Sequence, residues 1–342
     1  MMGIAPIRAR FFLGEEKNMW LYLLAMIVGL SVLVYSADVF IDGASHLAKK
    51  FHVPKVIIGM FIIGVGTSAP EMVVSVLSAM EGSSGLALGN AYGSNVVNIT
   101  LVLGLTTVIS PLFIQPTVVK KDFIWLFAIT ALALWQLWDK QLNRFEGFIL
   151  LFVLFVLLTQ QFIEARKSAK DSAAALAEEE LSQLQEIKIP LALAKLTGGL
   201  IALIISSRLI VWGAVELAQL WGLSELIIGL TIVAIGTSLP ELVSSVMAAR
   251  RGEHEMALGN VIGSNIFNTL AVVGLASAIS PFNIAPEILR RDIFVMVALT
   301  VLLFVLCLWA LRNGGRMGRS AGAILTASFI AYTLWLLHDA LT

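Results

Sequence analysis

The chain has 342 residues, of which 58% are apolar and 13% are charged, and its mean hydropathy is +0.90. Because a soluble domain typically carries about 25% charged residues, this composition excludes a soluble globular protein. The 23 basic and 23 acidic residues cancel, which excludes the basic surface of a nucleic-acid-binding protein. One cysteine, Cys307, and four scattered histidines cannot build a disulfide framework or a Cys/His zinc site.

Apolar stretches follow one another along the chain. A transmembrane helix needs about 20 mostly apolar residues, and the sequence predicts ten such spans, at residues 20–46, 56–79, 86–109, 122–138, 145–163, 190–219, 226–249, 256–279, 292–311 and 321–339. The predicted fold class is therefore an all-α integral membrane protein. Arg8 and Arg10 precede the first span as they would in a signal peptide, but that span has a counterpart at 190–219, so we expect a retained helix.

A polar interval at residues 164–189 divides the chain into an N-terminal part, 1–163, and a C-terminal part, 190–342. Ten of the 25 residues from 164 to 188 are charged, which predicts a solvated linker, with a short surface helix as the alternative. Loops after the odd-numbered spans hold 14 Lys and Arg residues, against 7 on the other side. Since cytoplasmic loops are enriched in Lys and Arg, we expect the linker in the cytoplasm and both termini outside.

The two parts repeat each other at a constant offset of 170 residues. Residues 53–111 and 223–281 share 28 identical positions of 59 without a gap, which chance does not produce. The best-matched blocks are GTSAPE with GTSLPE and ALGNAYGSN with ALGNVIGSN, starting at Gly66, Gly236, Ala87 and Ala257. Each part holds an odd number of spans, which predicts two inverted five-helix repeats, as in secondary transporters with substrate sites between the repeats.

Glu71 and Glu241 occupy equivalent positions in the middle of spans two and seven. A carboxylate at the centre of a membrane helix costs about 2.5 to 3.5 kcal/mol on insertion scales, so a matched pair of them indicates a cation. Thr67 and Ser68 precede Glu71 by four and three residues and share its helical face, as Thr237 and Ser238 do for Glu241. The prolines before the glutamates cannot donate a backbone hydrogen bond, which predicts free backbone oxygens near Gly64, Gly66, Ala234 and Gly236.

The spans that follow carry a matching row of polar residues. Asn90, Ser94 and Asn98 lie four residues apart, and Asn260, Ser264 and Asn268 repeat the row. The small-residue face made by Gly89, Gly93, Gly259 and Gly263 predicts a close approach to the glutamate helices. All of these ligands are oxygens, which hard cations such as Ca²⁺ prefer.

Each motif has a plainer structural interpretation. A Thr-Ser-Pro cluster is more often a benign kink than a binding site, and asparagine in a membrane helix commonly links neighbouring helices. The duplication of both motifs around a central glutamate favours the functional interpretation. Asp38, Asp42 and Glu216 lie near span ends and are interpreted as structural.

The two blocks resemble those of the cation/Ca²⁺ exchanger superfamily, in particular its prokaryotic sodium/calcium exchanger branch, whose paired repeats carry G-T-S-x-P-E and G-N-x-x-G-S-N. The resemblance covers nearly the whole chain. It implies a ten-helix antiporter in the plasma membrane, the inner membrane of a bacterium, in which spans two, three, seven and eight enclose the ions and spans one and six slide past them. It implies Ca²⁺ and Na⁺ as substrates, no enzyme activity and no cofactor, and no obligate protein partner can be inferred from it.

The resemblance also implies roles for individual residues. Ca²⁺ would bind the carboxylates of Glu71 and Glu241 and the carbonyls of Thr67 and Thr237, with Asn98 and Asn268 flanking it. Sodium would bind Ser68, Ser94, Ser238 and Ser264 and the carbonyls of Gly64 and Ala234. Family members often have an acidic residue at the position of Asn268, so the coupling ion and any K⁺ requirement stay open here.

Repulsion between two buried carboxylates would trap an empty site on one side of the membrane, whereas Ca²⁺ or a set of Na⁺ or H⁺ would relieve it. The sequence therefore predicts Na⁺/Ca²⁺ exchange, with H⁺/Ca²⁺ exchange as the alternative. An intramembrane enzyme would need a partner such as a histidine, and neither block contains one. A cation channel could use the same oxygens, but opposed repeats with broken helices fit alternating access better.

Overall fold

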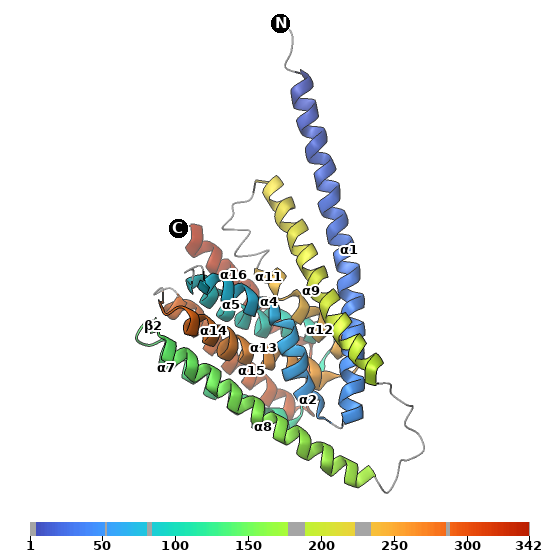
Figure 1. The fold of residues 1–342 in the computed structure, drawn as a ribbon, viewed down its shortest axis with the longest axis vertical. Coiled ribbons are helices and arrows are strands. Elements are labelled where there is room, and N and C mark those ends of the chain that lie inside the picture. The colour runs from blue at the N-terminus through green and yellow to red at the C-terminus, as the bar shows by residue number, and fades with distance from the viewer. Residues whose placement is uncertain are drawn as a thin grey trace.

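The computed structural model describes residues 5–51, 53–80, 84–176, 189–222, 234–284 and 288–341. These residues are almost entirely helical (Figure 1). The first part of the chain contains α1 (Ala5–Phe51), α2 (Lys55–Ile57), η1 (Ile58–Ile63), α3 (Gly64–Thr67), α4 (Ala69–Met80), α5 (Ser84–Val97), η2 (Asn98–Val102), α6 (Leu103–Ile109), α7 (Pro116–Gln136) and α8 (Arg144–Leu176).

The second part contains the counterparts of most of these elements. They are α9 (Ile189–Leu220), α11 (Ala234–Thr237), α12 (Leu239–Arg250), α13 (His254–Phe267), η4 (Asn268–Val272), α14 (Val273–Ile279), η5 (Ile288–Ile293), α15 (Phe294–Arg312) and α16 (Arg319–Leu341). The segments labelled η are π-helical turns.

Among the described residues, seven helices are long and apolar enough to cross a membrane, and the bent segment from Lys55 to Met80 would make an eighth. Part of the predicted span 226–249 lies outside the described residues. Helix α7, which carries Lys120, Lys121 and Asp122 in its second turn, is not among the seven. The protein is therefore an all-helical membrane protein, and its division into ten spans stays a prediction. Helix α8 runs from the predicted fifth span into the predicted linker and ends at Leu176; residues 177–188 of that linker lie outside the described residues.

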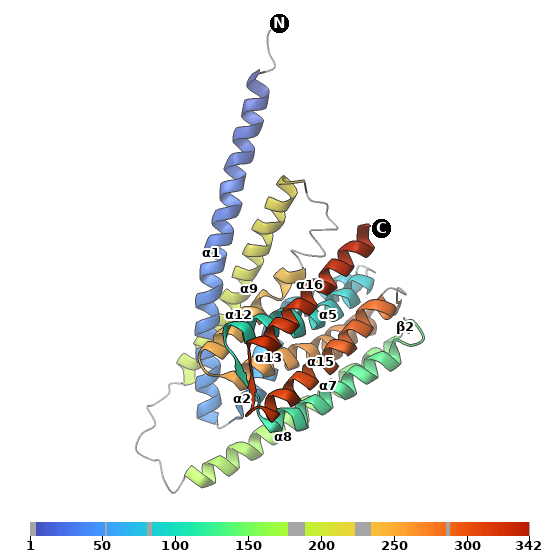
Figure 2. The same ribbon diagram turned by 180° about the vertical axis from the view of Figure 1, so that it is seen from behind.

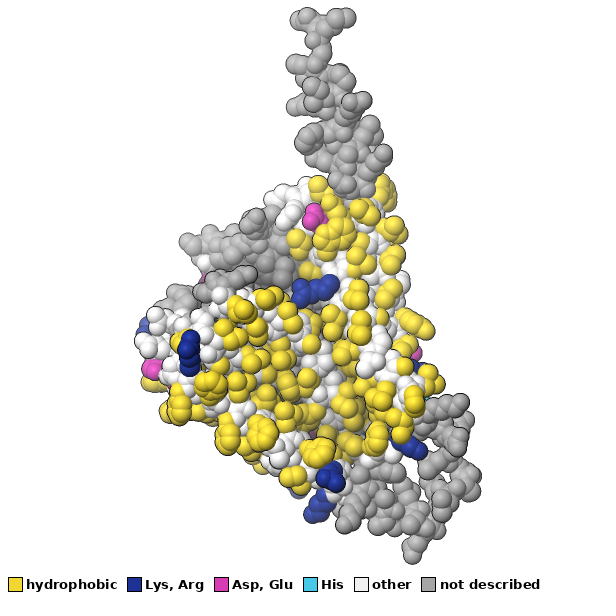
Figure 3. Space-filling view, in the orientation of Figure 1, with side chains coloured by type: hydrophobic (Ala, Val, Ile, Leu, Met, Phe, Trp, Pro, Cys, Tyr) yellow, Lys and Arg dark blue, Asp and Glu magenta, His cyan; other side chains and the backbone are white. Residues whose placement is uncertain are grey.

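The helices that carry the two motif blocks lie at the centre of the molecule. In the segment His254–Ile279, about 83% of the apolar stretch that is long enough to cross a membrane is buried. In Arg144–Lys167 of α8, the corresponding share is 17%. Phe148, Phe152 and Phe155 of α8 are all more than half exposed, and one face of the molecule is covered by apolar side chains (Figure 3). This arrangement matches a membrane protein whose outer helices contact lipid while its inner helices are shielded.

The helices α1 and α9 form a long antiparallel pair beside the remaining helices (Figures 1 and 2). Their backbones touch, since a Cβ added to Gly199 of α9 would lie 2.8 Å from the Cα of Phe40 on α1. The small residue at this position therefore sets the distance between the two helices.

Two short antiparallel strand pairs join the parts of the chain. Strand β1 (Leu112–Phe113) pairs with β4 (Arg316–Met317), and β2 (Gln141–Leu142) pairs with β3 (Phe282–Asn283). The helices follow the same plan, because α6 packs on α16 and α14 packs on α8. Outer helices and strands of each part therefore pack against elements of the other part, and the motif helices lie between them.

Candidate functional site

Both glutamate helices are interrupted just before the glutamate. Ser68 has backbone angles of φ −84° and ψ 4° and separates α3 from α4, while Ser238 has φ −91° and ψ 7° and separates α11 from α12. In the first part the axis bends by 46° at this break. Proline two residues further on explains the interruption, because Pro70 and Pro240 have no N–H for the preceding turn. Glu71 and Glu241 therefore lie in the first turn of a new helix in the middle of the protein.

The two carboxyl groups are buried and belong to one site. Glu71 and Glu241 are each 1% exposed, and Ser68, which stands three residues before Glu71, contacts Glu241. Ser68 donates a hydrogen bond across the interface between the parts, with 3.2 Å from its Oγ to Oε1 of Glu241. The other oxygen of Glu241 and both oxygens of Glu71 have no hydrogen-bond partner in the described part of the chain.

Buried carboxylate oxygens without partners are costly unless a cation or a proton compensates them. In the described part of the chain, further buried side-chain atoms of the motif-bearing spans also lack a hydrogen-bond partner, namely Ser238 Oγ, Ser244 Oγ, Asn95 Oδ1, Asn265 Oδ1 and the side-chain amides of Asn98 and Asn268. The described residues hold no group of three or more His, Cys, Asp or Glu side chains placed to bind a metal ion together. A cation at this place would therefore need hydroxyl, amide and carbonyl oxygens in addition to the two carboxylates.

The other predicted ligands lie just before the glutamate helices, on α3 and α11, or on the helices that follow them, α5 and α13. Thr67, Ser94 and Ser264 are buried, and Thr237 is partly buried. Ser264 donates to the carbonyl of Gly64 at 3.4 Å, and Thr67 donates to Oδ1 of Asn260 at 3.3 Å. Ala234 begins α11, and its side chain lies outside the described residues.

Asn98 and Asn268 are placed where each long helix changes its winding. Each residue begins a π-helical turn, η2 and η4 respectively. Such turns shift the backbone hydrogen bonds and occur frequently at functional sites. Both side chains are buried, with at most 1% exposure, so their amide oxygens face protein rather than lipid.

The predicted close approach between motif helices is present on one side. A Cβ added to Gly263 would lie 2.3 Å from the carbonyl oxygen of Met60, so α13 and η1 touch through their backbones. An added Cβ at Gly89 or Gly93 meets no described atom within 4 Å. The segment equivalent to η1 falls in residues 223–233, outside the described residues, so the prediction for these two glycines stays untested.

The sequence interpretation named Asn90 and Asn260 as candidate ligands but missed their serine partners, Ser75 and Ser245. Asn90 donates to the carbonyl of Glu71 at 3.3 Å and to Ser75 at 3.1 Å. Asn260 repeats this with Glu241 at 3.2 Å and with Ser245 at 2.8 Å. These asparagines thus fasten the glutamate helices to their neighbours. Their serine partners stand four residues after each glutamate in both blocks, and that repetition was a usable signal.

Three further hydrogen bonds join different helices. Asn95 donates to Thr269 Oγ1 at 3.0 Å, and Asn265 donates to the carbonyl of Asn95 at 3.4 Å. Ser207 of α9 donates to the carbonyl of Gly236 at 3.0 Å. The sequence predicts a free carbonyl at Gly236, and this prediction is wrong, because Ser207 donates a hydrogen bond to it. The equivalent residue in α1 is Ala37, so the sequence carries a signal of this asymmetry.

Comparison with known proteins shows the family of the chain. The sequence model of the family described as sodium/calcium exchanger protein matches residues 21–163 and 191–338. The chain belongs to the sodium/calcium exchanger family. It is thus a member of the cation/Ca²⁺ exchanger superfamily, as the two motif blocks indicated.

Three relatives align with this chain over almost their full length. The chain is 42% identical to the putative antiporter CaxA of Alkalimonas amylolytica, over 90% of this chain and 96% of that protein. It is 38% identical to the inner membrane protein YrbG of Escherichia coli, over 91% and 95%. It is 30% identical to the sodium/calcium exchanger MaX1 of Methanosarcina acetivorans, over 92% and 98%.

A solved structure shares the fold. The sodium-calcium exchanger NCX_Mj superposes with a TM-score of 0.76 at 29% identity, covering 91% of this chain and 97% of that one. The family and its structural neighbours are transporters rather than enzymes. The predicted class of integral membrane exchanger is thereby confirmed, while the ions and their ligands are proposals.

Proposed function

We propose that this protein is a secondary active antiporter that exchanges Ca²⁺ for Na⁺ by alternating access at one all-oxygen site. The observation that carries the proposal is the meeting of two buried carboxylates, one from each part of the chain, with three of their four oxygens lacking partners among the described residues. An arrangement of two inverted five-helix repeats would place this site between the repeats, near the middle of the membrane.

The proposed Ca²⁺ ligands are the carboxylates of Glu71 and Glu241 and the carbonyls of Thr67 and Thr237. Ca²⁺ takes about 6 to 8 oxygen ligands, so bidentate carboxylates and neighbouring amides could complete its shell. Sodium is proposed to bind the oxygens of the nearby serines and of the two helix breaks. These are Ser68, Ser94, Ser238 and Ser264, with the carbonyls of Gly64 and Ala234, while Asn98 and Asn268 flank the centre.

Coupling follows from charge. A site with two ionised carboxylates cannot pass through an occluded, low-dielectric state without compensation. One Ca²⁺ balances both charges, and so does a set of monovalent cations. Because both kinds of cation compete for the same oxygens, the protein changes between its outward-facing and inward-facing states with one kind or the other bound. The result is exchange.

The relatives support the choice of Na⁺ without excluding H⁺. The Methanosarcina relative and NCX_Mj are named as sodium/calcium exchangers, whereas the Alkalimonas relative is named only as a putative antiporter. Asn268 makes the site symmetric and leaves it with two carboxylates. The alternative proposal is therefore H⁺/Ca²⁺ exchange, or exchange that also needs K⁺.

The deciding experiment measures radioactive Ca²⁺ uptake into proteoliposomes with an imposed Na⁺ gradient. Uptake that follows the outward Na⁺ gradient, and that does not need K⁺, supports the proposal. Uptake that ignores Na⁺ and follows a pH gradient establishes the alternative. A conductance in single-channel recordings would instead indicate a channel.

The proposed orientation has both termini outside and residues 164–188 in the cytoplasm of a cell whose plasma membrane holds the protein. It rests on the excess of Lys and Arg in the loops after the odd-numbered spans. Cysteine substitutions at Lys49 and at Lys140 should be labelled from opposite sides of the membrane in intact cells. Labelling of both from the same side would contradict this orientation.

A further inference from the structure

The helix pair of α1 and α9 is distinct from the other described helices, which we call the bundle. Only 33% and 22% of the apolar stretches of α1 and α9 that could cross a membrane are buried. The pair lies at the side of the bundle (Figures 1 and 2). The end of α1 lies against the start of α9, because Gly43 contacts Ala192 and Leu196. We call this the linker end of the molecule.

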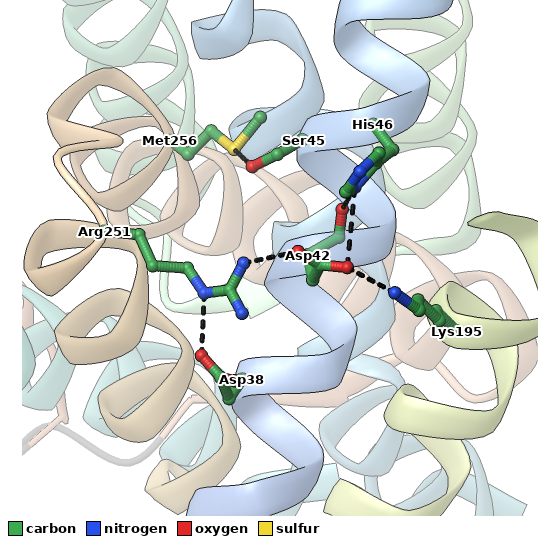
Figure 4. A network of polar contacts seen from close by, with 7 residues as sticks. All are labelled: Asp38, Asp42, Ser45, His46, Lys195, Arg251 and Met256. Atoms are coloured by element: carbon green, nitrogen blue, oxygen red, sulfur yellow. Dashed lines mark hydrogen bonds and ion pairs between the residues drawn. The ribbon is translucent and has the colours of Figure 1, made fainter. Parts of the chain in front are cut away.

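One arginine of the bundle reaches the helix pair at the linker end. Arg251, directly after α12, donates from Nε to Oδ1 of Asp38 at 2.7 Å and from Nη1 to Oδ1 of Asp42 at 2.6 Å (Figure 4). Both aspartates belong to α1. Among the described residues, these contacts are the only ion pairs between the helix pair and the bundle.

Asp42 is also held from within the helix pair. Lys195 of α9 donates to its Oδ2 at 2.7 Å, and the ring of His46 lies 2.7 Å from its backbone oxygen (Figure 4). If Arg251 moves away, Asp42 therefore keeps its ion pair with Lys195, whereas Asp38 loses its ion pair with Arg251. The cluster can thus release Arg251 without leaving Asp42 unpaired.

The same arginine is rigidly connected to the candidate ion site. Glu241 lies in the first turn of α12, and Arg251 follows its last residue. Because a helix of this length moves as one body, a movement of Glu241 relative to α1 must also move Arg251 relative to Asp38. The side chains of Arg251, Asp38 and Asp42 are 31%, 40% and 21% exposed, so water can replace the ion pairs when they open.

We propose that Arg251, Asp38 and Asp42 form a lock that holds the helix pair against the bundle at the linker end and opens once in each transport cycle. The inference rests on the proposed function, because alternating access requires one group of helices to move against another. Partly exposed ion pairs are individually weak. A lock made of two of them can close and reopen repeatedly.

The test measures the distance between two spin labels in the ion-free protein in liposomes. The labels are placed at Lys50→Cys on α1 and Lys120→Cys on the bundle, in a Cys307→Ala background. Both lysines are exposed, and α7 begins near this end, since Lys121 pairs with Glu164 of α8 at 3.2 Å. Arg251→Gln should raise the population of a second distance by about threefold to tenfold, the size expected for two partly exposed ion pairs. Asp38→Asn should do so less strongly, and Arg251→Lys should partly restore the original distribution.

Lys55→Gln is the matched control. It removes the ion pair from Lys55 to Glu253, which is 2.6 Å long and lies at the same end but within the bundle. An unchanged distribution in both Arg251→Gln and Asp38→Asn, or an equal shift in Lys55→Gln, would overturn the proposal. The distances are read without transport, so a failure of Na⁺/Ca²⁺ exchange in the gradient assay and a failure of the lock are separate results.

Discussion

Ser68 in the first part of the chain donates a hydrogen bond to Glu241 in the second part, with 3.2 Å between Oγ and Oε1. The repeat-related contact is missing from the described residues, because Ser238 Oγ and both carboxylate oxygens of Glu71 have no partner there. The two motif copies therefore make one shared site whose halves differ in their hydrogen bonds.

Neutralising either carboxylate should abolish stabilisation by Ca²⁺. A ligand at about 100 times its Kd stabilises the folded state by about 2.7 kcal/mol, so Ca²⁺ should raise the unfolding temperature of the wild-type protein. Glu71→Gln and Glu241→Gln should each lose this increase, yet be more stable than wild type without cations, because an uncompensated buried charge is removed. Thermal unfolding of the purified protein with and without Ca²⁺ is the measurement.

Glu216→Gln serves as the control for these variants, since Glu216 lies on α9 outside the two motif blocks. It should keep the full effect of Ca²⁺. The proposed ligand roles would be refuted by Ca²⁺ stabilisation of both motif variants to the wild-type extent.

Removing the Ser68 hydroxyl should be more harmful than removing its counterpart. Ser68→Ala leaves one more buried carboxylate oxygen of Glu241 without a donor, which costs about 1 to 3 kcal/mol. Ser238→Ala removes a hydroxyl that has no partner among the described residues. In cation-free buffer, Ser68→Ala should therefore unfold at the lower temperature, and equal unfolding temperatures would argue against the Ser68 to Glu241 contact.

The contact from Ser207 to Gly236 should stabilise the break before Glu241. Ser207→Ala leaves a carbonyl without this donor and should lower the free energy of unfolding by about 1 kcal/mol. Ser207→Thr keeps the hydroxyl and should recover part of the loss. Chemical denaturation of the detergent-purified protein provides the comparison.

The neighbouring residue offers a control for that effect. Ser206 is also buried, but among the described residues its hydroxyl bonds to Leu203 of its own helix, at 3.0 Å. Ser206→Ala should change stability less than Ser207→Ala. The reverse order would show that the contact with Gly236 contributes nothing.

Two adjacent glycines of α9 should respond differently to alanine. A Cβ on Gly199 would meet backbone atoms of Phe40 at 2.8 Å, so Gly199→Ala must push α9 away from α1 and destabilise the pair. A Cβ on Gly198 meets no described atom within 4 Å. Because alanine favours a helix over glycine by about 0.5 to 1 kcal/mol, Gly198→Ala should be neutral or stabilising. Unfolding temperatures of the two variants in detergent test this, and similar losses in both would contradict the packing of α1 on α9.

The sequence predicted the membrane class and the location of the described helices because both follow from hydrophobic length. It also identified Glu71 and Glu241, since a repeated carboxylate within an apolar span needs compensation. It did not predict the strand pairs β1–β4 and β2–β3 or the extension of α8 to Leu176. Strands of two residues are too short for a pattern, and the start of a charged interval does not end a helix by itself.

The fine structure of the site depended on contacts between distant residues. The interpretation of Asp38 and Asp42 as structural is consistent with their ion pairs to Arg251. The spacing of nearby residues could not identify that partner, because it is 213 and 209 residues away in the sequence. The expectation of a free Gly236 carbonyl was wrong for the same reason, because Ser207 comes from another helix.

From residue order alone, this protein is a duplicated membrane chain with one costly acid in each copy, because burial in lipid penalises charge wherever the chain places it. Only the tertiary structure decided that the two acids share a single site, which neighbours bond to them, and that an arginine ties the outer helices to the inner ones. Those outcomes depend on which helix faces meet, and helix faces are chosen by packing between segments that the sequence keeps far apart.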